Sequence, residues 1–477
     1  MINQFNLLNI KNDDYLVLLI YFMMESSTKK HYVAVIGGSV SGSQAANILA
    51  EKGYKVVVFE MNDLPYGKIE DGLPKWHVNL RDKQEKNIDQ KLDHPNIYFI
   101  PSVKIGRDID FEDLLNQWGF SIIIFASGAW QDRALPVDGI DKFIDNGLIY
   151  QNSLLYWYNH KHESDYKGIK YELKDRTIVI GGGLASLDVM KLGMIELVQN
   201  ALEKEKGIKI DMFTFEKKGL AKVLDETGFT LKDLNLYGMT LVYRRNATDM
   251  PLKTPKDNTK ENIEKARVVS DKLLNKYVEN FLFHFVPLSS PVDKVEENGI
   301  LKGIVFQKNE IIDGKLLVKE GETFVLETPM VISSIGSLPE KIDGLPYQYS
   351  LLKMIGESGY RVEGFSNVFA IGNTVTGQGN IRESKKHGVL MTNKIIDDHI
   401  EKADFFEEWL GAYNESLTGE IKDQMGEIEK EILSKDSVPD RLLQNMEDKI
   451  KTYQERVGYS NYQEWIRSKT PIRLENM

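Results

Sequence analysis

The chain of 477 residues contains no cysteine. This absence excludes disulfides, thiolate nucleophiles, Cys-X-X-Cys redox pairs and cysteine-ligated iron–sulfur clusters. Any electron chemistry must therefore be carried by a bound organic cofactor.

Long hydrophobic runs are also missing. The apolar stretch YLVLLIYFMM at 15–24 has ten residues, whereas a membrane-spanning helix needs roughly twenty. Acidic residues flank it where a secretory signal would carry basic residues and a cleavage site. We interpret residues 1–30 as a disordered or mis-started leader, upstream of a start at Met23 or Met24, and expect a cytoplasmic protein without membrane association.

Basic residues are fewer than acidic residues, so the net charge is −11. An acidic balance disfavours wholesale nucleic-acid binding. The content of 42% hydrophobic and 27% charged residues is that of a globular protein, and the length suggests two or three domains.

Residues 31–60, HYVAVIGGSVSGSQAANILAEKGYKVVVFE, alternate between strand, glycine turn, helix and strand. In a GxGxxG turn the glycines permit a tight bend and a close approach of the backbone to a pyrophosphate at the helix N-terminus. Gly37 and Gly42 take the outer positions, and Ser39, small and able to donate to phosphate, takes the middle one. Glu60 ends the next strand, where a carboxylate accepts from ribose hydroxyls. This unit predicts a dinucleotide site.

A second such turn follows at VIGGGLAS, where Gly181, Gly183 and Ser186 fit G-x-G-x-x-A. Arg244 and Arg245 end the strand predicted at 239–245, and two guanidinium groups suit a 2′-phosphate, which favours NADP over NAD.

Two alternatives to this interpretation of the arginines stay open. The pair would equally be a solvated strand end. A rival strand at 208–216, IKIDMFTFE, would place Glu216 on the ribose of NAD.

Two turns indicate two dinucleotides. We expect the first to hold a resident FAD and the second an exchangeable nicotinamide cofactor, with their reactive rings meeting between domains as hydride transfer requires.

The rest of the chain alternates between strand and helix patterns. We expect strands at 97–104, 121–128, 329–336 and 367–373, short strands between 296 and 327, and a charged helical segment at 253–276. After about residue 400 the sequence is rich in Glu and Lys at helical spacing, which we interpret as a solvated helical extension, with a coiled-coil partner helix as the less favoured alternative.

Several motifs in this order resemble the adrenodoxin reductase-type ferredoxin–NADP reductases, which are themselves similar to the small subunit of glutamate synthase. The resemblance covers about residues 31–400. It rests on VIGGSVSG, VFEMNDLPYGKIEDG, SVKIGRDIDFEDL, FASGAW, VIGGGLASLDVMK, LVYRRNATDMP, ISSIGSLPEKIDGLP and VFAIGNTVTGQGNI.

The resemblance implies an α/β fold with two Rossmann-like domains of the glutathione-reductase type. The FAD-binding domain would comprise 31–128 and 336–400, the NAD(P)-binding domain would be inserted at 129–335, and 401–477 would form a helical C-terminal extension.

The resemblance also assigns site residues. Val103 would meet adenine through its backbone, 126–128 would cross between domains, and 379–381 would lie near the flavin's pyrimidine edge. The expected FAD-binding residues are Gly37, Gly38, Ser39, Ser41, Gly42, Glu60, Val103, Ala126, Ser127, Gly128, Gly372, Asn373, Gly379, Asn380 and Ile381. The expected NADP-binding residues are Gly181, Gly183, Leu184, Ala185, Ser186, Arg244 and Arg245.

The chain departs from the family at three positions. Ser39 replaces the middle glycine of the first turn. Asn373 stands where related flavoproteins have aspartate or tryptophan. His77 lies one place later than the family's flavin-side histidine, and we interpret it as the candidate catalytic residue that polarises the flavin, with a structural role as the alternative.

The predicted function is hydride transfer from NADPH to FAD and delivery of electrons to an external acceptor, most simply a carrier protein such as ferredoxin. No metal and no nucleic-acid partner is expected, and the protein would be a monomer or homodimer. The basic side chains considered for docking a carrier are Lys75, Arg81, Lys83, Lys86, Arg382, Lys385 and Lys386; ordinary solvated charges are the alternative.

Three other functions remain open at this point. The chain would serve as the reductase subunit of a larger enzyme, although it has no cysteine-rich N-terminal domain. GGSVSG also resembles the first turn of flavin monooxygenases. Ser39 and Asn373 would also suit a nucleotide-binding scaffold that has lost its flavin.

Overall fold

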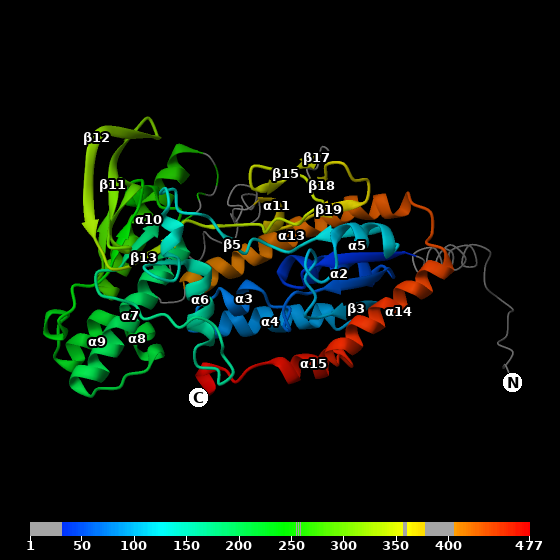
Figure 1. The fold of residues 1–477 in the computed structure, drawn as a ribbon, viewed down its shortest axis with the longest axis horizontal. Coiled ribbons are helices and arrows are strands. Elements are labelled where there is room, and N and C mark those ends of the chain that lie inside the picture. The colour runs from blue at the N-terminus through cyan, green and yellow to red at the C-terminus, as the bar shows by residue number, and fades with distance from the viewer. Residues whose placement is uncertain (1–30, 254, 256, 258, 356–359, 377–404) are drawn as a thin grey trace.

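The computed structural model describes residues 31–253, 255, 257, 259–355, 360–376 and 405–477, with the backbone alone for 405–416. Two sheets with covering helices form its centre, one mixed with mostly parallel pairs and one entirely parallel (Figure 1). No helix in these ranges is long and apolar enough to cross a membrane.

The first sheet has seven strands in the order β17-β18-β19-β4-β1-β2-β3. Strand β1 pairs in parallel with both β2 and β4, so the direction of winding changes at β1. Every residue of β1 is buried, as its unbroken apolar sequence predicts for a central strand. The strands are β1 (Tyr32–Ile36), β2 (Lys55–Phe59), β3 (Ile97–Ile100), β4 (Ile122–Phe125), β17 (Met354–Ile355), β18 (Arg361–Val362) and β19 (Val368–Ala370).

The helices of this part follow its strands in the chain. Helix α2 connects β1 to β2 and ends before Gly53, whose φ of +91° reverses the chain. The helices are α2 (Val40–Glu51), α3 (Lys68–Asp71), α4 (Val78–Leu92), α5 (Phe111–Gln117) and α11 (Asn373–Thr376).

The second sheet has five parallel strands in the order β6-β13-β7-β8-β9. They are β6 (Leu148–Tyr150), β7 (Ile178–Gly181), β8 (Thr240–Val242), β9 (His284–Val286) and β13 (Val331–Ser334). Their helices are α6 (Gln151–His160), α7 (Leu184–Lys206), α8 (Met212–Lys218), α9 (Leu220–Thr227) and α10 (Lys260–Phe281). A three-stranded antiparallel sheet is added by β10 (Ser289–Glu297), β11 (Ile300–Ile312) and β12 (Lys315–Glu327).

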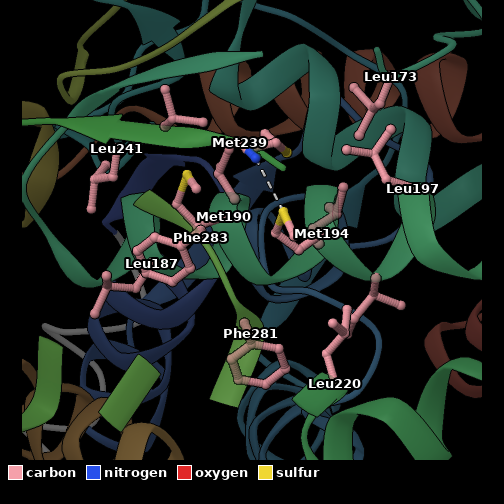
Figure 2. Packing of buried hydrophobic residues seen from close by; sticks show 14 of the residues in the cluster. Leu173, Leu187, Met190, Met194, Leu197, Leu220, Met239, Leu241, Phe281 and Phe283 are labelled. Atoms are coloured by element: carbon pink, nitrogen blue, oxygen red, sulfur yellow. Dashed lines mark hydrogen bonds between the residues drawn. The ribbon is translucent and has the colours of Figure 1, made fainter. Parts of the chain in front are cut away.

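Helix α7 is the centre of the largest apolar cluster. Gly193 allows Met239 to pack closely, because a Cβ at this position would overlap the thioether of Met239. The Met239 N–H donates to Met194 Sδ at 3.3 Å, and Leu187 and Phe281 complete this part of the cluster (Figure 2). The strand–turn–helix unit after β7 is thereby fixed in a well-packed core.

Two connections link the sheets and pair with each other. The chain leaves the first sheet after β4 and returns to it after β13. These segments carry the short strands β5 (Gln131–Asp132) and β14 (Ser337–Leu338), which form an antiparallel pair. The predicted insertion of one dinucleotide-binding unit into the other is consistent with these crossings.

The C-terminal helices are α13 (Phe405–Leu433), α14 (Asp440–Val457) and α15 (Tyr462–Lys469). They run along the first sheet's side of the molecule (Figure 1), and α13 packs against α2. Ile421, Met425 and Ile428 are buried in the core of the first sheet. The prediction of helices is confirmed, whereas the prediction that the extension is solvated is wrong.

The rival strand considered at 208–216 is absent. Asp211 instead accepts a hydrogen bond from the Thr214 N–H at 2.9 Å and caps helix α8, which includes Glu216. The strand predicted at 239–245 is confirmed by β8.

Candidate functional site

A cavity of about 1370 Å³ lies at the carboxyl ends of the parallel strands of both sheets. Both glycine turns line it, with Gly37, Ser39, Val40 and Ser41 from the first turn and all residues from Gly181 to Ser186 from the second. Ligands of open α/β sheets bind at this edge, where the direction of winding changes. The two predicted dinucleotide sites are thus parts of one continuous cavity.

The outer positions of the first turn require glycine. Gly37 has a φ of +99°, and a Cβ there would lie 2.7 Å from the carbonyl oxygen of Ala126. A Cβ at Gly42 would overlap the Gly37 carbonyl oxygen. The backbone therefore bends around the site as the predicted pyrophosphate cradle requires.

Ser39, the departure at the middle position, has a hydrogen-bond partner within the protein. Its hydroxyl donates to the Tyr66 carbonyl oxygen at 2.9 Å and thus joins the turn to the segment before α3. Ser41 lines the cavity and packs against Gly372, where a Cβ would overlap the Ser41 hydroxyl. Ser39 thus has a structural role in addition to the predicted contact with phosphate.

Glu60 is a buried carboxyl group on the cavity wall. Its two oxygens accept from the Gly38 N–H at 2.8 Å and the Asn62 N–H at 3.0 Å. Burial raises the pKa of Glu60 to about 7, although these backbone hydrogen bonds oppose the rise. A buried carboxylate at the end of β2 fits the hydroxyls of a ribose.

The neighbouring predicted FAD contacts also line the cavity. The Val103 N–H donates to the Glu60 carbonyl oxygen at 2.8 Å, so a backbone contact with adenine would use the carbonyl oxygen of Val103. Ala126, Ser127 and Gly128 continue from β4, and the Gly128 N–H donates to Thr374 Oγ1 at 2.8 Å.

Asn373 begins α11 and lines the cavity. Gly379, Asn380 and Ile381 lie outside the described residues, so the predicted contacts at the flavin's pyrimidine edge stay predictions.

The second turn is built around close packing and one open position. A Cβ at Gly181 would lie against Ser186 and Ser334, and one at Gly182 would overlap the ring of Tyr243. By contrast, a Cβ at Gly183 would meet no described atom within 4 Å. Among the described residues, Gly183 therefore leaves open space above the N-terminus of α7, and this space fits the predicted pyrophosphate.

The N-terminus of α7 supplies the electrostatics of this cradle. Leu184 and Ala185 open a helix of 23 residues and line the cavity. Their N–H groups belong to the first turn, which has no partners within the helix, and the helix dipole favours negative charge there. Ser186 turns inward and lies 3.0 Å from Ser334 Oγ, which fits the packing role of the third small residue.

The two arginines differ in their surroundings. Arg244 is exposed and lines the cavity, whereas Arg245 Nη2 donates to the Gly314 carbonyl oxygen at 2.9 Å and its Nε lies 3.7 Å from Asp249. Arg244 is therefore the better placed of the two for a 2′-phosphate. Glu216, the rival NAD contact, lies in helix α8 and pairs with Lys191 at 2.8 Å, so the expected strand-end carboxylate is not formed.

His77 precedes α4 and is buried. Its Nε2 accepts from Trp76 Nε1 at 2.9 Å and lies 3.8 Å from Asp188 Oδ1. Asp188 lines the cavity, and His77 lies behind Asp188 rather than on the cavity wall. The catalytic role of His77 stays a prediction.

Two members of the predicted docking patch are not on the surface. Lys75 is buried and pairs with Glu70 at 2.8 Å, and Arg81 is buried and pairs with Glu475. The prediction is wrong for both. Lys83 and Lys86 are exposed on α4, and the remaining members, Arg382, Lys385 and Lys386, lie outside the described residues.

Among the described residues, two acids and a histidine have the geometry of a metal site: Glu70, His160 and Glu163. Its groups already have partners. Glu70 pairs with Lys75 and Arg473. Although burial lowers the pKa of His160, its hydrogen bonds to two acids raise it to about 9. These contacts account for the cluster as an ion-pair network.

Lys68, Trp130 and Ser337 are among the cavity-lining residues that received no role from the sequence. Each lies inside a motif that carried the family resemblance. Their side chains meet only in the folded structure, so the motifs alone could not pair them.

The fold and the cavity define the class of the protein: it has the two-dinucleotide-binding architecture of FAD- and NAD(P)-dependent flavoproteins. The comparisons with known proteins agree. The FprA protein of Mycobacterium tuberculosis, whose structure was solved in complex with NADPH, has a TM-score of 0.59 at 18% identity, covering 89% of this chain and 90% of that protein.

More particularly, the sequence is similar to the adrenodoxin reductase-type enzymes, as the motifs predicted. The mitochondrial NADPH:adrenodoxin oxidoreductase of Arabidopsis thaliana is 25% identical over 364 residues, which cover 69% of this chain and 72% of that protein. A probable ferredoxin/ferredoxin–NADP reductase of Mycobacterium leprae is 31% identical over 161 residues, which cover 34% of this chain but 28% of that protein. No family model matches the chain. The predicted resemblance and fold class are confirmed.

Proposed function

We propose that this protein is an NADPH-dependent flavoprotein oxidoreductase that passes electrons to an external acceptor, a carrier protein such as ferredoxin. The observation that carries the proposal is the single cavity that joins both glycine turns, with Glu60 at the first and Arg244 at the second. The names of the relatives, which are reductases of adrenodoxin and ferredoxin, support it.

The first turn and its neighbours fit FAD. Gly37 to Gly42 would hold its pyrophosphate, Glu60 would accept from its ribose, and Val103 would face its adenine. A bound FAD would supply the chemistry that the cysteine-free chain lacks, by accepting a hydride and releasing electrons. The protein's part is to bind and orient the cofactor and to exclude water.

The second turn fits NADPH. The open space at Gly183 and the N-terminus of α7 would hold the pyrophosphate, and Arg244 would bind the 2′-phosphate. On this proposal, 31–128 and 336–400 form the FAD-binding domain and 129–335 the NAD(P)-binding domain. The cytoplasmic location and the monomeric or homodimeric state stay predictions.

The first test is the absorbance spectrum of the purified protein supplied with FAD, recorded before and after anaerobic addition of NADPH or NADH. We expect a flavin band that NADPH bleaches faster than NADH. If the protein takes up no FAD, the proposal is wrong, and the alternative of a nucleotide-binding scaffold without flavin is favoured.

Arg244→Ala tests the assignment of NADPH. Loss of a charge-assisted contact of about 1.5–3 kcal/mol should weaken NADPH binding roughly 10- to 100-fold without affecting NADH. Arg245→Ala is the matched control, and its effect should be smaller because Arg245 already binds the Gly314 carbonyl oxygen. Equal effects of both variants on NADPH would contradict the assignment.

A further inference from the structure

Lys68 lies on the wall of the cavity between the two turns. It begins α3 and lines the cavity. The preceding residue, Gly67, lies against the first turn, since a Cβ there would be 3.0 Å from Ser39 Oγ. Lys68 Nζ donates to Ser337 Oγ at 3.0 Å, on the connection that follows β13. The ammonium group therefore lies where the wall passes from the first turn toward the second.

Both connections between the sheets surround this ammonium group. Its nitrogen lies 5.8 Å from the centre of the Trp130 ring on the first connection. Asn152 Nδ2, from α6, donates to the Trp130 carbonyl oxygen at 2.9 Å and to the same Ser337 hydroxyl at 3.0 Å. These contacts hold the lysine side chain in place.

The positive charge of Lys68 is only partly compensated. Burial lowers the pKa of Lys68 to about 8, while Asp132 acts in the opposite direction. Burial also raises the pKa of Asp132 to about 6. At neutral pH both groups are charged. Because the Lys68 ammonium group is partly removed from water and Asp132 is its counter-charge, a further negative charge nearby would stabilise it.

A dinucleotide oxidoreductase creates such a charge during its reaction. When a hydride, one proton with two electrons, passes from NADPH to FAD, the products are NADP⁺ and the reduced anionic flavin FADH⁻. We propose that the ammonium group of Lys68 stabilises the negative charge of the reduced flavin, so that the protein binds FADH⁻ more tightly, relative to FAD, than it would without this lysine. The inference rests on the proposed function, because it requires FAD in the cavity.

A merely structural role for Lys68 would have a different signature. If Lys68 only joined α3 to β14, the potential of bound FAD would respond to loss of its hydrogen bond to Ser337 and not to loss of its positive charge. Ser337→Ala removes the hydrogen-bond acceptor and keeps the charge. Lys68→Met removes the charge and keeps most of the side-chain length, and Lys68→Arg keeps the charge in another shape.

The experiment measures the midpoint reduction potential of bound FAD at pH 7 in the holoprotein and these three variants. For Lys68→Met we expect the protein to lose at least tenfold of its preference for FADH⁻ over FAD. For a two-electron couple, this loss makes the midpoint potential about 30 mV more negative. Lys68→Arg and Ser337→Ala should stay near the wild-type potential. If Lys68→Met does not fold, Lys68→Gln takes its place.

An unchanged potential in Lys68→Met, or an equal shift in Ser337→Ala, would overturn the inference while the proposed function stands. A wild-type protein that binds no FAD would overturn both.

Discussion

At the scale of single residues, Glu60 combines two properties that oppose each other. Its carboxyl group is buried, with a pKa raised to about 7 by that burial. Its predicted task is to accept hydrogen bonds from ribose hydroxyls, which the ionised form does best. The affinity for FAD should therefore depend on pH near neutrality.

We predict that the apoprotein binds FAD about tenfold more weakly at pH 6 than at pH 8, because roughly a tenth of Glu60 is ionised at pH 6. Titration of FAD fluorescence at several pH values measures this. Glu60→Gln should bind more weakly at pH 8 and lose the pH dependence. A wild-type affinity that is constant between pH 6 and pH 8 would exclude this role.

Burial of Glu60 has the opposite consequence for the stability of the apoprotein. A folded pKa above the unfolded value means that its contribution to stability is fully present below the unfolded pKa. This contribution is lost as pH rises through about 7. FAD binding and apoprotein stability thus respond to Glu60 with opposite signs.

The sequence was sufficient to place Glu60 and the outer glycines in one strand–turn–helix unit, because that unit is local, while their contacts with FAD stay predictions. It was not sufficient to rank Arg244 over Arg245. Both follow the same strand, and the partner that engages Arg245 is the carbonyl oxygen of Gly314, 69 positions later. Choices of this kind depend on contacts between distant segments.

At the scale of helices and strands, local competition explains why the rival strand at 208–216 does not form. Its first residues, IKID, alternate in polarity as a strand does, but Asp211 and Thr214 form a helix cap. The cap was visible in the sequence, as an Asp at the start of a short helix, and it outweighed the alternation.

Helix α13 shows why composition alone did not predict the burial of the C-terminal extension. Its many charged residues suggested a solvated helix, yet one face bears Ile421, Met425, Ile428 and Ile432, all fully buried. The partner is α2, the helix that follows the first glycine turn. The spacing of these apolar residues was visible in the sequence as one helix face, but nothing local identified α2, more than 350 positions earlier, as its partner.

We predict that Ile428→Ala lowers the free energy of unfolding by about 2–5 kcal/mol, because it removes a fully buried side chain from the contact with the first sheet's core. Thermal or urea denaturation measures the loss. Leu433→Ala is the control on the same helix, since Leu433 is 59% exposed, and it should change stability by less than about 0.5 kcal/mol. Similar losses in both variants would show that α13 is not packed as described.

At the scale of the whole molecule, residues from opposite ends of the sequence share one ion-pair network. Arg473 Nη1 lies 2.6 Å from Glu70 Oε1, and its Nη2 lies 2.9 Å from both oxygens of Glu85. Glu70 belongs to α3, whose residues line the cavity. Burial alone would raise the pKa of Glu70, but the charges and hydrogen bonds of Lys75 and Arg473 hold this pKa well below its ordinary value.

We predict that Arg473→Met destabilises the protein by about 3–5 kcal/mol at pH 7, because it leaves buried carboxylates without their partner. Because the folded pKa of Glu70 lies well below the unfolded value of 4.5, its stabilising contribution is fully present above the unfolded pKa and is lost only as pH falls through the folded pKa. The difference between variant and wild type should therefore persist at pH 4.5 and shrink only below it. Urea denaturation at both pH values measures it.

The matched control is Arg467→Met, which removes an exposed arginine of α15 and should be nearly neutral. Equal stability of the two variants at pH 7 would contradict the importance of the network.

The same network has a consequence for the synthesis of the protein. Glu70 and Arg473 are separated by 403 positions, and a ribosome adds about 5–20 residues per second. For tens of seconds the nascent chain therefore carries Glu70 without its guanidinium partner. The first glycine turn can form early, but α3, which contributes Lys68 to the cavity wall, gains its ion pair with Arg473 only after Arg473 has left the ribosome.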